Sequence, residues 1–277
     1  MNSRAFKNFK KKMGQANHFL ITILIGLDAV KNGAQKDENF DAAWNPFDVQ
    51  ASVRRSKEFA INSALAWAVD GLDMYVRLCN REPKLFHSQE SINIDKTKHS
   101  IYNKIRIITE NHKELDPIKS AFVDLLICWR NNMLHFDADN ALLQSSNTMF
   151  KKESTARAVE KYHLNIGEML EHFHANATPT FKEIATMFSM TIHFVEELDG
   201  LLMNDIDKTT YCEIILKKFL KENPDARHWK VFQKNGNIPY DERIKMIKQF
   251  FITLGVCPEL LEDNMDAIYN IILRQNI

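Results

Sequence analysis

The chain has 277 residues, 45% hydrophobic and 26% charged, which is enough to bury a sizeable core as one large domain or as a domain with an appendage. Its 36 basic and 36 acidic side chains give a formal net charge of zero, which excludes a global attraction to nucleic acid and restricts any RNA contact to a local patch. The cysteines lie far apart, without disulfide or zinc spacing. This cysteine usage fits a reducing compartment, so we expect a cytoplasmic protein without a metal or other cofactor.

Residues 1–47 combine a basic segment, an apolar helix and a polar linker. The apolar run from Phe19 to Leu27 predicts a buried first helix over 16–31. A basic segment before an apolar run is also typical of a signal peptide, but Asp28 closes this run and no small-residue cleavage site follows. Because the run is far shorter than the ~20 apolar residues of a membrane span, we expect no membrane segment.

An all-α fold is predicted, because glycine and proline are scarce and apolar residues recur at helical spacing almost throughout. Asp48 is suited to cap a long helix, and Asp116-Pro117 to start another with proline in the first turn. A polar loop is expected around 82–97. The expected helices run from Asp48 toward Arg81, near 98–112, from Asp116-Pro117 to the segment 130–135, and over 154–175 and 180–203.

Shorter helices are predicted in the last part of the chain, 205–277. Three helix-breaking pairs or triplets interrupt its apolar pattern. They are Asn223-Pro224, Asn235-Gly236-Asn237 and Cys257-Pro258. We therefore expect a C-terminal helical extension attached to a helical domain over 48–204.

The stretch Arg130-Asn131-Asn132-Met133-Leu134-His135 places a cation, amides and an imidazole directly after the apolar run 121–129. A permanent cation, a neutral amide and a titratable imidazole are the groups a protein needs to cut RNA without a metal. If the helix continues through this stretch, Arg130 and His135 point about 140° apart, whereas Asn131 and His135 share a face. One helix would then supply only part of a site.

Spacing alone does not select this pair. Random placement of the arginines and histidines gives roughly one such pair, and four are present: Arg81 to His87, Arg106 to His112, Arg130 to His135 and Arg157 to His163. Pro83 interrupts the first, and the second and fourth lie in charged stretches typical of solvated surface. The pair at Arg130 follows an apolar helix that can hold its side chains in fixed geometry, and amides follow its arginine.

The stretch Arg130 to His135 resembles the signature of the HEPN family: arginine, a polar residue that is often asparagine, a few variable residues, and histidine near the end of a core helix. The helix around 66–76 is similar to the first long helix of that family, and the segment 179–185 to a helix that follows the motif. The resemblance covers about 48–204. It implies a HEPN-like helical bundle, here with an extra N-terminal helix and the C-terminal extension.

The resemblance also implies a metal-independent endoribonuclease. Two copies pair in this family so that two motifs face each other across a groove, which implies a homodimer. His135 would move a proton, Arg130 would stabilise the charge on the phosphate, and Asn131 would orient His135 or the phosphate. The products would be 2′,3′-cyclic phosphate and 5′-hydroxyl ends.

Toxin–antitoxin or phage-defence systems are the implied setting, with RNA as substrate and an antitoxin or regulatory protein as a further partner. HEPN toxins that are silenced by nucleotide transfer carry a tyrosine two residues after the histidine. Asp137 stands there in this chain, which argues against that mode of regulation.

Further residues are candidates for supporting roles. Asp70 or Asp73 would hold Arg130 or His135 across a helix pair, and Asn132 is a second amide beside the arginine. Clusters of basic and aromatic side chains can contact RNA through phosphates and stacking. These candidates are Lys10, Lys11, Lys12, Arg227, Trp229 and Lys230.

Structural alternatives remain open for each feature. Arg130 and His135 could cap the C-terminal end of a core helix, where cations are favoured. The basic N-terminus could be a disordered arm, and 227–230 an amphipathic surface turn. Glu171 and His174 have the spacing of di-iron helices, but a solvated polar face is the simpler interpretation, so no metal site is expected. The alternative to a nuclease is an inert helical module that binds a protein, a nucleotide or RNA.

Overall fold

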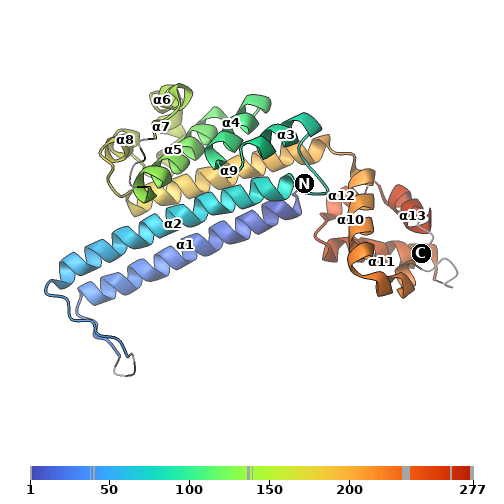
Figure 1. Cartoon of the computed structure of the whole chain (residues 1–277), viewed down its shortest axis with the longest axis horizontal. Coiled ribbons are helices and arrows are strands. Elements are labelled where there is room, and N and C mark those ends of the chain that lie inside the picture. Colours follow the sequence, from blue (N-terminus) through green and yellow to red (C-terminus); the bar gives the residue numbers. More distant parts are fainter. Residues whose placement is uncertain are drawn as a thin grey trace. The chain divides into compact units, whose positions relative to one another are not determined.

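The structure, a computed structural model, describes residues 2–37, 39, 41–135, 138, 140–232, 238–262 and 264–274, with the backbone alone at 227, 228, 230, 273 and 274. All regular secondary structure in these ranges is helical, which confirms the all-α prediction (Figure 1). The α-helices are α1 (Arg4–Lys31), α2 (Val49–Cys79), α3 (Ser88–Lys96), α4 (Ile101–Asn111), α5 (Pro117–Leu134), α6 (Gln144–Phe150), α7 (Glu153–Glu160), α8 (Ile166–His174), α9 (Phe181–Asp205), α10 (Lys208–Glu222), α11 (Tyr240–Thr253), α12 (Pro258–Glu262) and α13 (Met265–Arg274). Two 3₁₀ helices, η1 (Pro224–His228) and η2 (Lys230–Phe232), follow α10.

Contacts group the chain into two compact units. The larger comprises residues 9–74 and 96–195, and the smaller comprises 1–8, 75–95 and 196–277. The residues therefore group differently from the expected division at 47 and 204, because the long helices α1, α2 and α9 each contribute to both units. The Arg130 to His135 motif lies wholly within the larger unit.

In the larger unit, α1 and α2 lie side by side as an antiparallel hairpin (Figure 1). Ion pairs of Lys12 with Asp70 and of Lys57 with Asp28 join the two helices. The first helix starts at Arg4 rather than near residue 16, because Phe6, Phe9 and Met13 recur at helical spacing and are buried. The basic N-terminal residues are thus part of a helix, and the interpretation as a disordered arm is wrong.

The expectation that the apolar half of α1 is buried is also wrong. Within the run 19–27, Leu20 is the buried residue, and four large apolar side chains around it are exposed. The apolar residues occur on all sides of α1, whereas α2 covers one side. By length and composition α1 could cross a membrane, and 17% of its most apolar 18-residue window is buried; core helices and signal sequences pass the same test.

Helix starts that depend on capping are confirmed. Asp48 Oδ1 accepts from the backbone N–H of Ala51 at 2.9 Å, and Asp116 Oδ1 accepts from that of Ile118 at 2.8 Å. At α9, Thr180 and Glu183 bond reciprocally, each side chain accepting from the other's backbone N–H. Between its cap and its last turn, α5 is buried on every side from Ala121 to Trp129. This makes α5 a fixed platform for the motif at its end.

Short helices are where the sequence prediction differs from the structure. The predicted loop over 82–97 contains α3, and α6 was not predicted. The helix predicted over 154–175 is two helices, α7 and α8, because Asn165 caps a new start by accepting from the N–H of Glu168 at 3.3 Å. In the smaller unit, the breaks at Asn223-Pro224 and Cys257-Pro258 are confirmed, and the break at 235–237 lies outside the described residues.

Candidate active site

The motif begins on α5 and ends just beyond it. The helix ends at Leu134, and His135 follows with extended backbone (φ −114°, ψ 118°) while its N–H donates to the carbonyl of Asn131 at 3.0 Å. Because the chain leaves the helix here, His135 Nε2 comes to 3.1 Å from Arg130 Nη1. The prediction that the two side chains point about 140° apart is wrong, since it assumed a continuous helix. One chain brings the cation and the imidazole together.

Arg130 is held by a side-chain amide and an imidazole. Its Nη1 donates to Asn131 Oδ1 at 3.0 Å as well as contacting His135, and its Nε is buried without a partner in the described part of the chain. Asn131 therefore orients the guanidinium rather than the imidazole. No carboxylate pairs with Arg130 among the described residues.

Asn132 fixes the chain that follows the motif. Its Nδ2 donates to the carbonyl of Asn140 at 3.1 Å, and its Oδ1 accepts from the N–H of Asn140 at 2.7 Å. Asp124 lies about two turns earlier on α5. Its carboxyl group accepts from the N–H of Leu143 at 2.9 Å, and burial raises the pKa of that carboxyl group. The two side chains anchor the segment 140–143 to α5, so Asn132 has a positioning role.

An open hollow of about 610 Å³ lies over the motif. We call it the motif hollow; its lining residues are His99, Ser100, Ile101, Tyr102, Arg130, Asn131, Leu134, His135, Ala138 and Asn140. His99, exposed and just before α4, is a second imidazole that the sequence analysis missed. The signal for it was available: α4 and α5 are joined by a short turn, and two antiparallel helices so joined place the start of the first beside the end of the second.

Asp70 and Asp73 pair elsewhere than predicted. Asp70 forms an ion pair with Lys12, and Asp73 Oδ1 accepts from Lys104 Nζ at 2.6 Å, where the lysine side chain is almost fully buried. The second pair ties α4 to α2, so Asp73 contributes indirectly by holding the helix that follows His99. Neither aspartate lines the motif hollow.

Among the predicted RNA-contacting residues, the three lysines of the larger unit do not line the motif hollow either. Lys10 and Lys11 are exposed on α1, while Lys12 Nζ lies 5.3 Å from the centroid of the Trp67 ring. Trp229 packs in an aromatic cluster of the smaller unit, with its ring centroid 5.5 Å from that of Phe219. The side chains of Arg227 and Lys230 lie outside the described residues, as does Asp137.

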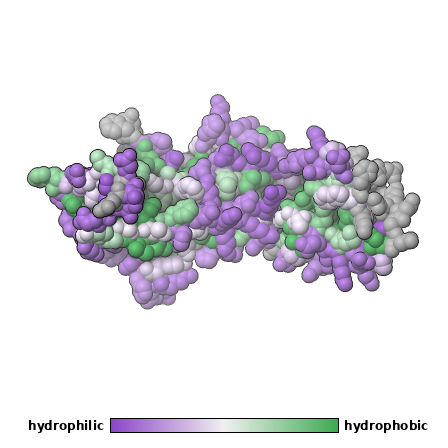
Figure 2. Space-filling model, turned by 90° about the horizontal axis from the view of Figure 1, so that it is seen from below, coloured by the Kyte–Doolittle hydropathy of each residue, from purple (hydrophilic) through white to green (hydrophobic). Residues whose placement is uncertain are grey.

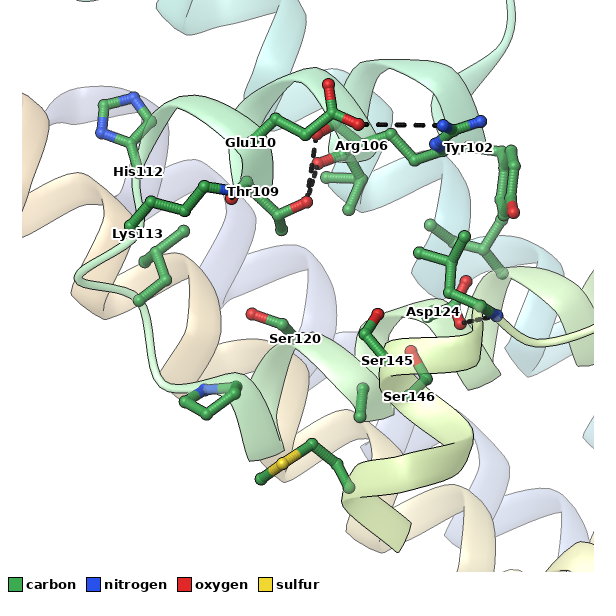
Figure 3. Close-up of a pocket in the computed structure, with 17 residues that line it drawn as sticks. Tyr102, Arg106, Thr109, Glu110, His112, Lys113, Ser120, Asp124, Ser145 and Ser146 are labelled. Carbon is green, nitrogen blue, oxygen red and sulfur yellow. Dashed lines mark hydrogen bonds and ion pairs between the residues drawn. The ribbon is translucent and has the colours of Figure 1, made fainter.

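A second hollow, of about 370 Å³, lies among α4, α5 and α6 (Figure 3). Arg106 and His112, one of the four arginine–histidine spacings, point to opposite ends of it, and Arg106 pairs with Glu110 at 3.7 Å. Arg157, from another of these spacings, pairs with Glu153. Both arginines therefore have acidic partners, whereas Arg130 has none among the described residues.

Within the described ranges, no three histidine, cysteine, aspartate or glutamate side chains gather as metal ligands would. Comparison of the chain with known protein families, with curated proteins and with solved structures gives no match.

Proposed function

We propose that the chain is a metal-independent endoribonuclease of the HEPN type, with Arg130 and His135 as its catalytic pair. The observation that carries the proposal is the 3.1 Å approach of Arg130 Nη1 to His135 Nε2 within an open hollow. A helix cap alone would not require the imidazole to meet the guanidinium, or the guanidinium to lack an acidic partner in the described residues.

The chemistry follows from the two groups. A phosphodiester in the motif hollow would be bound by the guanidinium of Arg130, which stabilises the added negative charge of the pentacoordinate transition state. An imidazole removes the 2′-hydroxyl proton, the 2′-oxygen bonds to phosphorus, and the bond from phosphorus to the 5′-oxygen breaks. The leaving 5′-oxygen takes a proton, which gives 2′,3′-cyclic phosphate and 5′-hydroxyl ends.

Such a reaction needs one group to accept a proton and another to donate one. The family resemblance assigns the second group to the motif of a second copy, in a homodimer. His99 of the same chain is the competing donor, because it lines the same hollow as His135. The proposed setting is a cytoplasmic toxin or phage-defence effector that an antitoxin or regulatory protein restrains.

The test is cleavage of a mixed-sequence RNA by purified protein in excess EDTA. Wild type should cut, the fragments should carry 2′,3′-cyclic phosphate, and His135→Ala should lower the rate about 10²–10⁴-fold, the usual contribution of a general acid or base. His163→Ala is the matched control, because His163 belongs to a spacing without the proposed role. Equal cleavage by wild type and His135→Ala would remove His135 from the site. No cleavage of RNA by wild type would favour the inert binding module.

A further inference from the structure

The hairpin of α1 and α2 carries an apolar strip that no described residue of the larger unit covers. Phe19 and Ile23 on α1 are 50% and 48% exposed, and Phe59 and Trp67 on α2 are 75% and 44% exposed. These four residues are called the apolar strip. Seen from below, the part of the surface formed by the hairpin shows apolar residues among hydrophilic ones (Figure 2). Contiguous exposed apolar side chains of this size mark an interaction surface.

The strip lies on one face of the hairpin. Phe19 and Ile23 are one helical turn apart, and Phe59, Ser63 and Trp67 follow one another at the same spacing on α2. The interhelical ion pairs, Lys12 with Asp70 and Lys57 with Asp28, set the register of the two helices. Halfway between the two ion pairs, Leu20 of α1 therefore lies opposite Ser63 and Ala64 of α2. The midpoint between Phe19 and Ile23 on α1 therefore lies at about the level of the midpoint between Phe59 and Trp67 on α2.

We propose that the apolar strip is the contact surface for a second copy of this chain. The strip is nearly self-complementary about a two-fold axis that crosses α2 at Ser63. Phe59 and Trp67 are each four residues from Ser63, so two antiparallel hairpins would place Phe59 of each copy against Trp67 of the other. On α1 the same axis passes between Phe19 and Ile23, which would likewise face one another across the copies. Isologous pairing of this kind is how most homodimers form.

Charge and polarity fit the same arrangement. Arg55 lies one turn beyond Phe59 and Asp70 one turn beyond Trp67, so the axis would bring Arg55 of one copy near Asp70 of the other. At the centre, the Ser63 hydroxyl already donates to the carbonyl of Phe59 at 2.8 Å and can be buried without losing a partner. A side chain added at Gly26 would meet nothing within 4 Å, so the helices can approach closely there.

A membrane fits the hairpin less well. The 18-residue window of α1 that passes for a membrane span does so only by including polar residues, since the apolar run from Phe19 to Leu27 rises about 14 Å along a helix against a hydrocarbon core of about 30 Å. The hairpin also carries acids along with its lysines and arginines, whereas helices that lie on membranes have a predominantly basic polar face. A strip about 24 Å long and two helices wide covers about 500 Å² per copy, near the lower limit for a specific interface. We therefore expect a dimer that dissociates on dilution.

The experiment is sedimentation of the full chain over a concentration series, without RNA. Wild type should shift from the 32.2 kDa monomer toward twice that mass as concentration rises. Ile23→Glu should abolish the shift. Ile25→Glu is the matched control: it adds the same charge on the same helix at a residue that is 65% exposed but faces away from the strip, and the dimer should persist.

A second variant tests the axis itself. Ser63→Cys should form an intermolecular disulfide under mild oxidation, since Ser63 would meet its own copy, whereas Ile25→Cys should not. The four native cysteines are buried and give no background.

Wild type that stays monomeric at about 100 µM, well above a micromolar Kd, overturns the proposal. Equal loss of dimer in both glutamate variants overturns it too. Binding of monomeric wild type to phosphatidylglycerol vesicles would assign the strip to a membrane. The mass readout is independent of RNA cleavage, so this inference and the proposed function can fail separately.

Discussion

Two polar clusters of the chain differ in their access to solvent, which decides whether they can bind and act on a ligand. In the smaller unit, the fully buried carboxylate of Asp199 accepts from the backbone N–H of Ser3 at 2.7 Å, from the Ser3 hydroxyl, and from the hydroxyl of Tyr75 at 3.1 Å. Burial raises the pKa of Asp199, as expected for a carboxyl group removed from water. In the motif cluster of the larger unit, Arg130 and His135 meet at an open hollow.

The comparison separates a polar group that stabilises from one that can react. A perturbed pKa by itself would draw attention to Asp199, since such groups concentrate at functional sites. Yet its oxygens are occupied by Ser3 and Tyr75, and solvent does not reach it. Arg130 and His135 have room for a ligand and, within the described residues, no acidic partner. We expect variants of the first cluster to change stability and variants of the second to change activity.

The largest expected effect is on Arg130. Arg130→Ala should lower kcat/KM for RNA about 10²–10³-fold, the usual loss when one charge-stabilising donor is removed from a transition state. Arg130→Lys should recover part of that loss, because it keeps the charge but not the planar fork that also bonds Asn131. Thermal unfolding should move little in either variant. Full activity in Arg130→Ala would show that the pair is a helix cap.

Next comes Asp199→Ala, which should reduce the free energy of unfolding by about 3 kcal/mol because it leaves buried donors of Ser3 and Tyr75 without an acceptor. Urea denaturation measures the loss, and cleavage per folded molecule should be unchanged. Asp70→Ala is the control, since its ion pair with Lys12 is largely exposed and should be worth under about 1 kcal/mol. An activity loss larger than the unfolded fraction would contradict this separation of roles.

The pH dependence of Asp199 has a definite sign. Its pKa is raised in the folded state, so the folded protein holds the proton more readily than the unfolded chain. The stability that Asp199 contributes is therefore fully present below the unfolded pKa of about 4 and is lost as pH rises through the folded value. The free energy of unfolding of wild type minus that of Asp199→Asn should fall as pH rises above about 4. A difference that rises with pH would contradict the assigned shift.

How far the sequence carries these conclusions depends on the kind of interaction. The starts of α2 and α5 were predictable because a cap is local: Asp48 and Asp116 bond atoms two or three residues away. The helix class was predictable from the apolar period. The burial of α1 was not predictable from the sequence. This helix is apolar on all sides, and only tertiary packing decides which side α2 covers.

The candidate site was predictable in composition but not in geometry. Context selected Arg130 and His135 among four similar spacings, yet their approach depends on where α5 ends, and helix ends are the least predictable boundaries. The partners of Asp70 and Asp73 were not predictable either, since Lys12 and Lys104 are distant in sequence. His99 could have been inferred from the α4–α5 turn.

A smaller effect is expected from Asn132, which touches the chain after the motif rather than the proposed substrate. Asn132→Ala removes two hydrogen bonds to the backbone of Asn140 and should lower cleavage about tenfold, since misplaced catalytic groups lose that much or more. Asn132→Asp keeps the acceptor for the Asn140 N–H and should recover part of the rate. If the role is positioning, KM should change less than kcat. Unchanged kcat in Asn132→Ala would show that segment 140–143 does not influence the pair.

The smallest effect distinguishes the second copy from His99 as the source of the other proton-transfer group. Inactive His135→Ala protein is added in threefold excess to wild type under conditions where subunits exchange. If each site needs both copies, only about a quarter of wild-type chains remain paired with wild type, and activity should fall to about a quarter. His99→Ala should then retain most of its activity. If His99 is the donor, added His135→Ala should leave wild-type activity unchanged, and His99→Ala should lose as much as His135→Ala. We expect the first pattern, and the bell-shaped pH dependence of kcat/KM should then need His135 alone among the histidines of the hollow.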